Sequence, residues 1–120
     1  MCGDFDHHDG LDDELFERFL ALAAERGVTP QADGRSCPAG LGDVSARRSY
    51  MDGLFKAGLT RAASDAAMLP AGERADAMAG QAIVFARLAG FLAGQFPPQA
   101  DLFRTITAAM LEGCDEVATR

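Results

Sequence analysis

Side chains that could bind a metal gather in residues 4–14, DFDHHDGLDDE, where His7 and His8 stand among five aspartates. Imidazole and carboxylate groups are both common metal ligands. Adjacent histidines point apart in most backbones, however, and the sequence has no second ligand pair of defined spacing. It therefore favours a loose acidic arm at residues 1–8 that leads into a helix, with no metal and no cofactor, and metal binding by His7 and His8 is the less favoured alternative.

Arg87 is the only charged residue in the stretch 80–96, GQAIVFARLAGFLAGQF. Because a guanidinium keeps its charge, it must meet a carboxylate, reach the surface or face an anion. A surface position or an ion pair is the most common solution. The candidate partners are Glu112, Glu17 and Asp101, and Tyr50 is the only phenol that could share their network. If no partner is near, Arg87, Tyr50 and Glu112 predict a site between helices for an anionic small molecule.

Signals for catalysis are weak. Cys37 and a histidine could form a nucleophile and base, but their spacing gives this no support. The sequence lacks G-x-S-x-G, a phosphate-binding glycine loop and H-E-x-x-H. Cys2, Cys37 and Cys114 are widely separated, which fits a reducing compartment. We therefore expect a protein that is not an enzyme, although a small enzyme with a pocket near Arg87 stays open.

The apolar periodicity predicts an all-α domain spanning residues 1–120. Amphipathic helices are expected at about 11–26, from Asp43 or Ser45 to the residue before Pro70, from about 73 to 96, and from Pro98 to about 117. A long loop should occupy 28–43. Short connections favour a compact bundle of four mostly antiparallel helices, or five if the second helix breaks at Gly53 or Gly58.

The third predicted helix is apolar on all sides, so we expect it to be buried at the centre of the bundle. Ala82, Ala86, Gly90 and Gly94 recur every four residues and predict a seam where a neighbouring backbone approaches closely. A membrane span is the competing interpretation. Arg87 at the centre of the run and two prolines directly after it argue against a span.

Charge and composition exclude some partners. Eighteen acidic and eleven basic residues give a net charge of -7, which repels nucleic acids and anionic membranes. The first residues lack the features of a secretory signal, so we expect a cytoplasmic protein. The basic residues are almost all arginine and asparagine is absent, which indicates GC-rich coding and hence a bacterial source.

These observations favour a small helical interaction or regulatory module that self-associates, as a dimer in the simplest case, through an apolar face of the last helix or the small-residue seam. A binding protein for an anionic small molecule near Arg87 is the alternative. The alanine-rich hairpin and amphipathic end of the last two helices resemble the end of the effector-binding half of TetR-type regulators. This resemblance implies a subunit interface, but the basic helix-turn-helix of that family is absent from the sequence.

Overall fold

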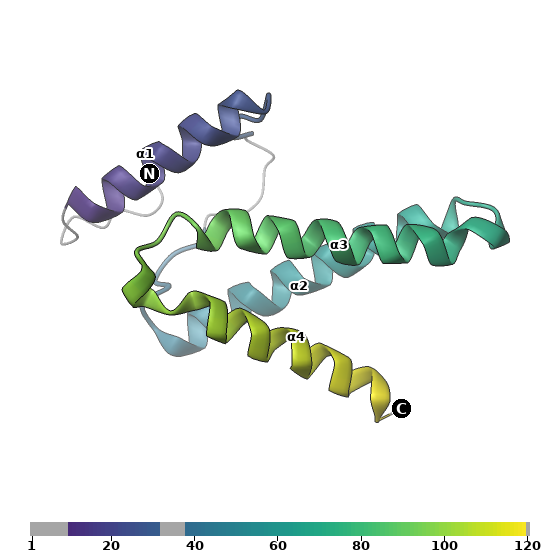
Figure 1. The fold of residues 1–120 in the computed structure, drawn as a ribbon. Coiled ribbons are helices and arrows are strands. Elements are labelled where there is room, and N and C mark those ends of the chain that lie inside the picture. Colours follow the sequence, from purple (N-terminus) through teal and green to yellow (C-terminus); the bar gives the residue numbers. More distant parts are fainter. Residues whose placement is uncertain (1–9, 32–37, 120) are drawn as a thin grey trace. The chain divides into compact units, whose positions relative to one another are not determined.

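The computed structural model describes residues 10–31 and 38–119 (Figure 1). Across these residues the chain is all-helical, with four α-helices and no strand. The helices are α1 (Gly10–Glu25), α2 (Val44–Ala67), α3 (Arg74–Ala93) and α4 (Leu102–Ala118), and two short 3-10 turns, η1 (Ala71–Glu73) and η2 (Pro98–Ala100), precede α3 and α4. The predicted helical class is thereby confirmed. The expected arm at 1–8, with His7 and His8, and Cys37 in the expected loop lie outside the described residues.

Local signals in the sequence account for the ends of the first two helices. Gly27 adopts a φ of 78°, and the N–H of Val28 donates to the carbonyl of Ala23 at 3.0 Å, which closes α1 in a Schellman motif. The side chain of Asp43 accepts a hydrogen bond from the N–H of Ala46 at 2.9 Å, so Asp43 is the N-cap of α2. Of the two expected caps of the second helix, Asp43 and Ser45, the structure has Asp43, and α1 ends one residue before the expected end at 26.

The second helix does not break at its glycines. α2 runs without interruption through Gly53 and Gly58, and a Cβ placed at either glycine would meet nothing within 4 Å. The alternative of five helices is therefore wrong.

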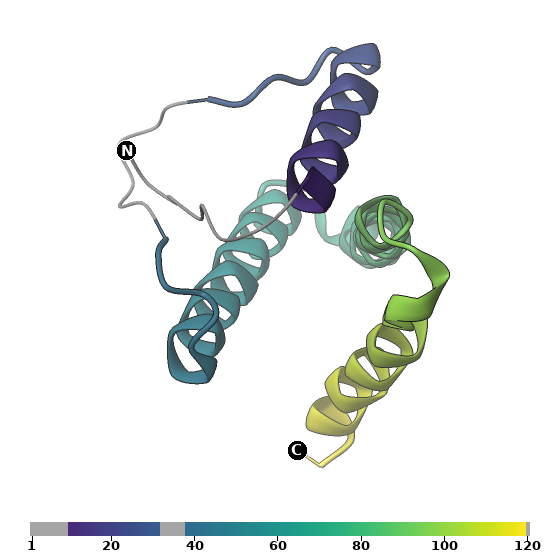
Figure 2. The ribbon, with the colours of Figure 1, turned by 90° about the vertical axis from the view of Figure 1, so that its left-hand side faces the viewer.

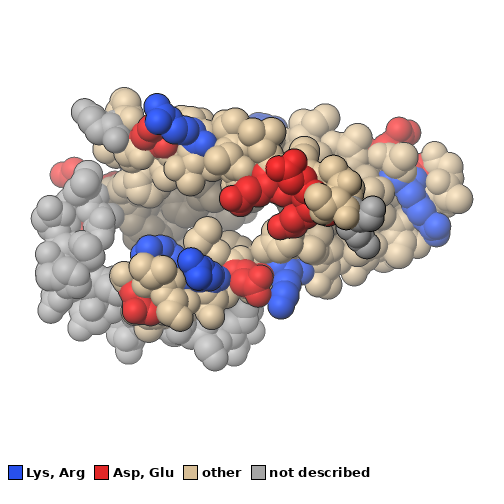
Figure 3. Space-filling view, turned by 90° about the horizontal axis from the view of Figure 1, so that it is seen from below, with Lys and Arg blue, Asp and Glu red and all other residues tan. Residues whose placement is uncertain are grey.

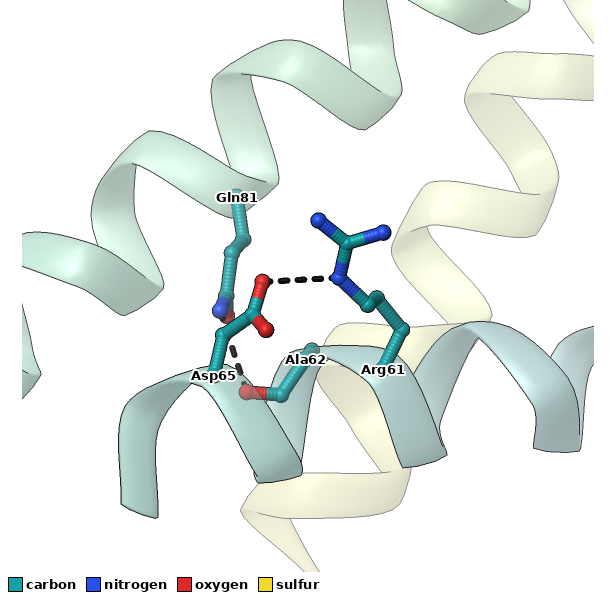
Figure 4. Close-up of polar contacts among 4 residues, drawn as sticks. All are labelled: Arg61, Ala62, Asp65 and Gln81. Carbon is teal, nitrogen blue, oxygen red and sulfur yellow. Dashed lines mark hydrogen bonds and ion pairs between the residues drawn. The ribbon is translucent and has the colours of Figure 1, made fainter. Parts of the chain in front are cut away.

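Two compact units divide the chain, and α3 belongs to both. In the first unit, which includes residues 38–82, α2 lies beside the first half of α3. Gln81 of α3 donates from Nε2 to the carbonyl of Ala62 at 3.0 Å (Figure 4). Beside this contact, Arg61 and Asp65 of α2 form an exposed ion pair at 2.9 Å. Small and half-buried residues of α2, Gly58, Ala62 and Ala66, leave room for α3.

The second unit comprises residues 10–28 and the described residues from 83 onward. It holds α1, the second half of α3, η2 and α4. In Figure 2, which looks almost along α3, the chain leaves the end of this helix and passes through η2 into α4. Asp101, between η2 and α4, has a φ of 55°, and its carboxylate pairs with Arg104 at 3.3 Å. α3 ends at Ala93, three residues before the predicted end at 96, and Pro97 and Pro98 follow a turn at residues 94–96.

The apolar helix α3 is largely exposed. Among the described residues only Ala93 and Gln95 are buried, at 5% and 6% exposure, while Ile83 on α3 is 69% exposed. A Cβ added at Gly90 would meet nothing within 4 Å, so no neighbouring backbone approaches the predicted seam there. The expectation that protein covers this helix on most sides is therefore not confirmed. The apolar residues of a helix indicate that burial of its surface is favourable, but they do not identify what buries it.

Candidate functional site

The second unit contains an open hollow between α1 and the second half of α3, with a volume of about 370 Å³. Its lining is apolar apart from two arginines. The lining residues are Phe19, Ala23, Arg26, Val28, Val84, Arg87, Leu88 and Phe91. We refer to it below as the α1–α3 hollow.

Aromatic packing holds α1 against α3 along one wall of this hollow. The rings of Phe19 and Phe91 lie 6.1 Å apart between centroids and are tilted by 59°. This is an arrangement that aromatic pairs favour, because the positive edge of one ring meets the negative face of the other. The pair fixes which sides of the two helices form the wall.

A polar contact at the end of α3 strengthens the same packing. Arg18 of α1 donates hydrogen bonds to the backbone carbonyl and, at 3.4 Å, to the side-chain oxygen of Gln95. The amide nitrogen of Gln95 donates in turn to the carbonyl of Phe91 at 3.0 Å. Gln95 is therefore a buried polar residue with its hydrogen bonds satisfied, as burial requires. Arg18 and Gln95 also line a second hollow beside the first, together with Glu14 and Pro97.

Both charged groups in the lining of the α1–α3 hollow are guanidinium groups. The guanidinium carbon of Arg26 lies 5.1 Å from the centroid of the Phe91 ring, a distance at which a cation is attracted to the face of the ring. Arg87 comes from the facing helix. Among the described residues no acidic side chain lines the hollow, and none of their carboxylates lies within ion-pair distance of either arginine. The hollow therefore offers positive charge beside an apolar surface.

The structure places the three predicted site residues in different surroundings. Arg87 lines the α1–α3 hollow, as described above. Glu112 lines a shallow depression on α4 with Asp115, Glu116 and Thr119. Tyr50 lies on α2, in the other unit, and is 42% exposed. Of the predicted site residues, only Arg87 is in the hollow.

Sequence reasoning did not assign Arg26 to a site, although a signal was present. Arg26 continues the apolar row of Leu15, Phe19 and Leu22 at the end of the first helix. A charged residue in an apolar row indicates that the row ends at a surface or that a ligand meets the charge there. The sequence could not show that Arg87, some sixty residues later, reaches the same hollow.

Metal and thiol chemistry gain no support from the part of the chain that the structure describes. It contains no group of three or more His, Cys, Asp and Glu side chains that could hold a metal ion. Cys114, on α4, is a free and exposed cysteine. The candidates His7, His8 and Cys37 lie outside the described residues, so the alternatives that involve them stay as predictions.

One described stretch, Ala71–Ala93, is long and apolar enough to cross a membrane as judged by length and composition alone. None of its most apolar window is buried. The same two criteria are also met by core helices of soluble proteins.

Comparison of the chain with protein-family models, with curated proteins and with solved structures finds no match in any of the three.

Proposed function

We propose that this chain is a non-enzymatic helical module that self-associates, as a homodimer in the simplest case, and completes its hydrophobic core in the assembly. The observation that carries the proposal is the near absence of buried apolar side chains in the described chain, where Ala93 is the only one. A folded domain of this length is expected to bury roughly two thirds of the surface of its unfolded chain. The remaining apolar surface calls for a partner.

Two helices carry exposed apolar residues at intervals of seven. On α3 these are Met78, Phe85 and Leu92, and on α4 they are Phe103, Met110 and Val117. Residues seven apart lie on the same side of a helix, and such stripes pair with one another in bundles and coiled coils. Complete burial of a fully exposed side chain of this kind is worth about 1.5–3 kcal/mol, and these six, which are 43–70% exposed, can gain part of that each. Six of them can offset the several kcal/mol of freedom that two molecules lose on association.

Self-association would also allow the compact, mostly antiparallel bundle that the sequence favours to form from the helices of two copies. Helices from two copies would supply the cover that one copy lacks. Figure 3 shows broad uncharged areas between the charged side chains on one face, which leaves space for such contacts. We propose a water-soluble cytoplasmic module of bacterial origin, without nucleic-acid or membrane partners, in keeping with its net charge of -7.

Multi-angle light scattering after gel filtration tests the proposal. The full chain at micromolar concentration should elute as a dimer or a larger oligomer. Phe85→Glu should shift it toward the monomer, because the charge enters the stripe on α3. Ile83→Glu is the matched control, because Ile83 is two positions away, points to another side of α3 and is also exposed.

Two results would contradict self-association. The first is a strict monomer with the unaltered sequence, and the second is equal assembly of both glutamate variants. Recovery of the chain with zwitterionic vesicles in a flotation assay, lost in Phe85→Glu, would instead indicate that the stretch Ala71–Ala93 enters a membrane.

A second candidate function is the binding of an anionic small molecule. It is favoured by one observation, which is that Arg26 and Arg87 line the same apolar hollow and that no other described residue of its lining is charged. Native mass spectrometry of freshly purified protein tests this candidate and the first together, because it reports both the number of chains and any bound mass. Persistent absence of added mass in preparations from several growth conditions would count against a ligand.

A further inference from the structure

We propose that the α1–α3 hollow binds an amphiphile that joins one anionic head group to a hydrocarbon chain, such as a medium-chain carboxylate. This inference rests on the second candidate function and names the chemical class of its ligand. Two features of the hollow carry it: the apolar lining fits a hydrocarbon chain, and the two arginines fit an anionic head group.

The apolar lining favours a hydrocarbon chain. Phe19, Val84, Leu88 and Phe91 form its surface, and Val84 and Leu88 are exposed to solvent in the free chain. None of the described lining residues has a hydroxyl or amide side chain. A nucleotide or a sugar would lose its hydrogen bonds to water there without replacement, whereas a hydrocarbon chain loses none. Most of the ligand should therefore be apolar.

The two arginines favour a single anionic head group. A guanidinium presents planar donors that match a carboxylate or a phosphate. Arg26 is held over the Phe91 ring, so part of its freedom is already lost before a ligand binds. Since none of the described lining residues is acidic, an anion entering the hollow meets attraction from both arginines and no repulsion from the described lining.

The volume of the open hollow gives the scale of a suitable probe. If each group takes a volume like that of one water molecule, about 30 Å³, then 370 Å³ holds about a dozen non-hydrogen atoms. Decanoate has this size. Its chain can cover the apolar lining while its carboxylate reaches the arginines at the rim.

Isothermal titration calorimetry with three probes of equal chain length tests the inference. Decanoate, decanol and decylammonium are titrated into the full chain below their micellar concentrations. We expect decanoate to bind about tenfold more tightly than decanol, and decylammonium to bind weakest. Arg87→Gln and Arg26→Gln should each weaken decanoate about tenfold and leave decanol almost unchanged. Arg48→Gln, at an exposed position on α2, is the control and should change neither probe.

The outcomes separate this inference from both proposed functions. If decanoate and decanol bind equally well, or if Arg48→Gln and Arg87→Gln lose the same affinity for decanoate, the ligand need not be anionic. The hollow would then remain an apolar binding site. No binding of any probe, together with added mass in the native spectrum, would overturn the hydrocarbon class but keep a ligand. The oligomeric state, measured on the same samples without a probe, decides self-association independently.

Discussion

The guanidinium of Arg26 lies over the face of Phe91, 5.1 Å from the ring centroid, while Phe19 meets the same ring from α1. Phe91 therefore contacts both Phe19, through which α1 packs on α3, and Arg26, one of the two charged residues of the hollow. Its aromatic character contributes more than its apolar area, because a leucine of similar volume offers neither an edge-to-face partner nor a negative face.

We expect Phe91→Leu to lower the free energy of unfolding by about 1–2 kcal/mol, since it removes the Phe19 ring contact and the Arg26 contact but keeps an apolar side chain. Urea unfolding followed by far-ultraviolet circular dichroism, at one fixed protein concentration, measures the change. Phe55→Leu, at a position on α2 that is 57% exposed and belongs to neither apolar stripe, is the control, and its effect should stay within about 0.5 kcal/mol. Equal effects of the two variants would show that Phe91 does not have this role.

Arg18→Ala should destabilise the chain by about 1–2 kcal/mol, because the backbone carbonyl of the buried Gln95 then loses its side-chain donor. Arg61→Ala provides the comparison. It removes an ion pair with Asp65 whose side chains are 77% and 44% exposed, and such pairs contribute about 0.5 kcal/mol or less. If both alanine variants unfold at the same urea concentration, the contact between Arg18 and Gln95 is not a significant one.

Two glycine-to-alanine substitutions should change stability in opposite directions. Gly27→Ala forces a φ of 78° on an alanine and should cost about 1 kcal/mol. Gly53→Ala lies inside α2 with nothing within 4 Å of the new methyl group, and should stabilise by about 0.5–1 kcal/mol. Thermal unfolding of the two variants beside the unaltered chain measures both signs. A stabilising Gly27→Ala would mean that α1 does not end in the observed motif.

Salt should have opposite effects on the two proposed kinds of binding. Each copy carries a net charge of -7, so added salt screens the repulsion between copies and should strengthen self-association. The attraction between decanoate and the two arginines is screened as well, and its affinity should fall. Sedimentation velocity and calorimetry in 50 mM and 500 mM sodium chloride, concentrations chosen to span roughly 14 to 4 Å of Debye length, measure the two trends. If added salt changes self-association and decanoate affinity in the same direction, one of the two proposals, self-association or anion binding, is contradicted.

The sequence predicted the helices better than it predicted their burial. Helix ends depend on local features, so Gly27, Asp43 and the two prolines after α3 could be found within a few residues. Burial depends on which surfaces meet. The run around Arg87 is apolar on all sides whether it is covered by the same chain, by a second copy or by lipid, and periodicity cannot distinguish these covers.

The candidate site was found only in part for a related reason. Arg87 was recognised because it is a single charge in an apolar run. Arg26 belongs to a separate helix, and its partnership with Phe91 requires a long-range contact that no spacing encodes. Glu112 and Tyr50 were proposed as neighbours by residue type alone. Glu112 lines a depression on α4 and Tyr50 belongs to the other unit, so the site of all three residues stays a prediction.

The continuity of α3 links the unfolding of the two units. One hydrogen-bonded helix begins in the unit of α2 and ends in the unit of α1 and α4, with no interruption at residues 82 and 83. Melting of either half therefore exposes a fresh helix end in the other, and a helix frays from its ends. Hydrogen–deuterium exchange of the backbone amides of α3 would show whether its two halves lose protection together, as one cooperative element, or whether the less stable half loses protection first.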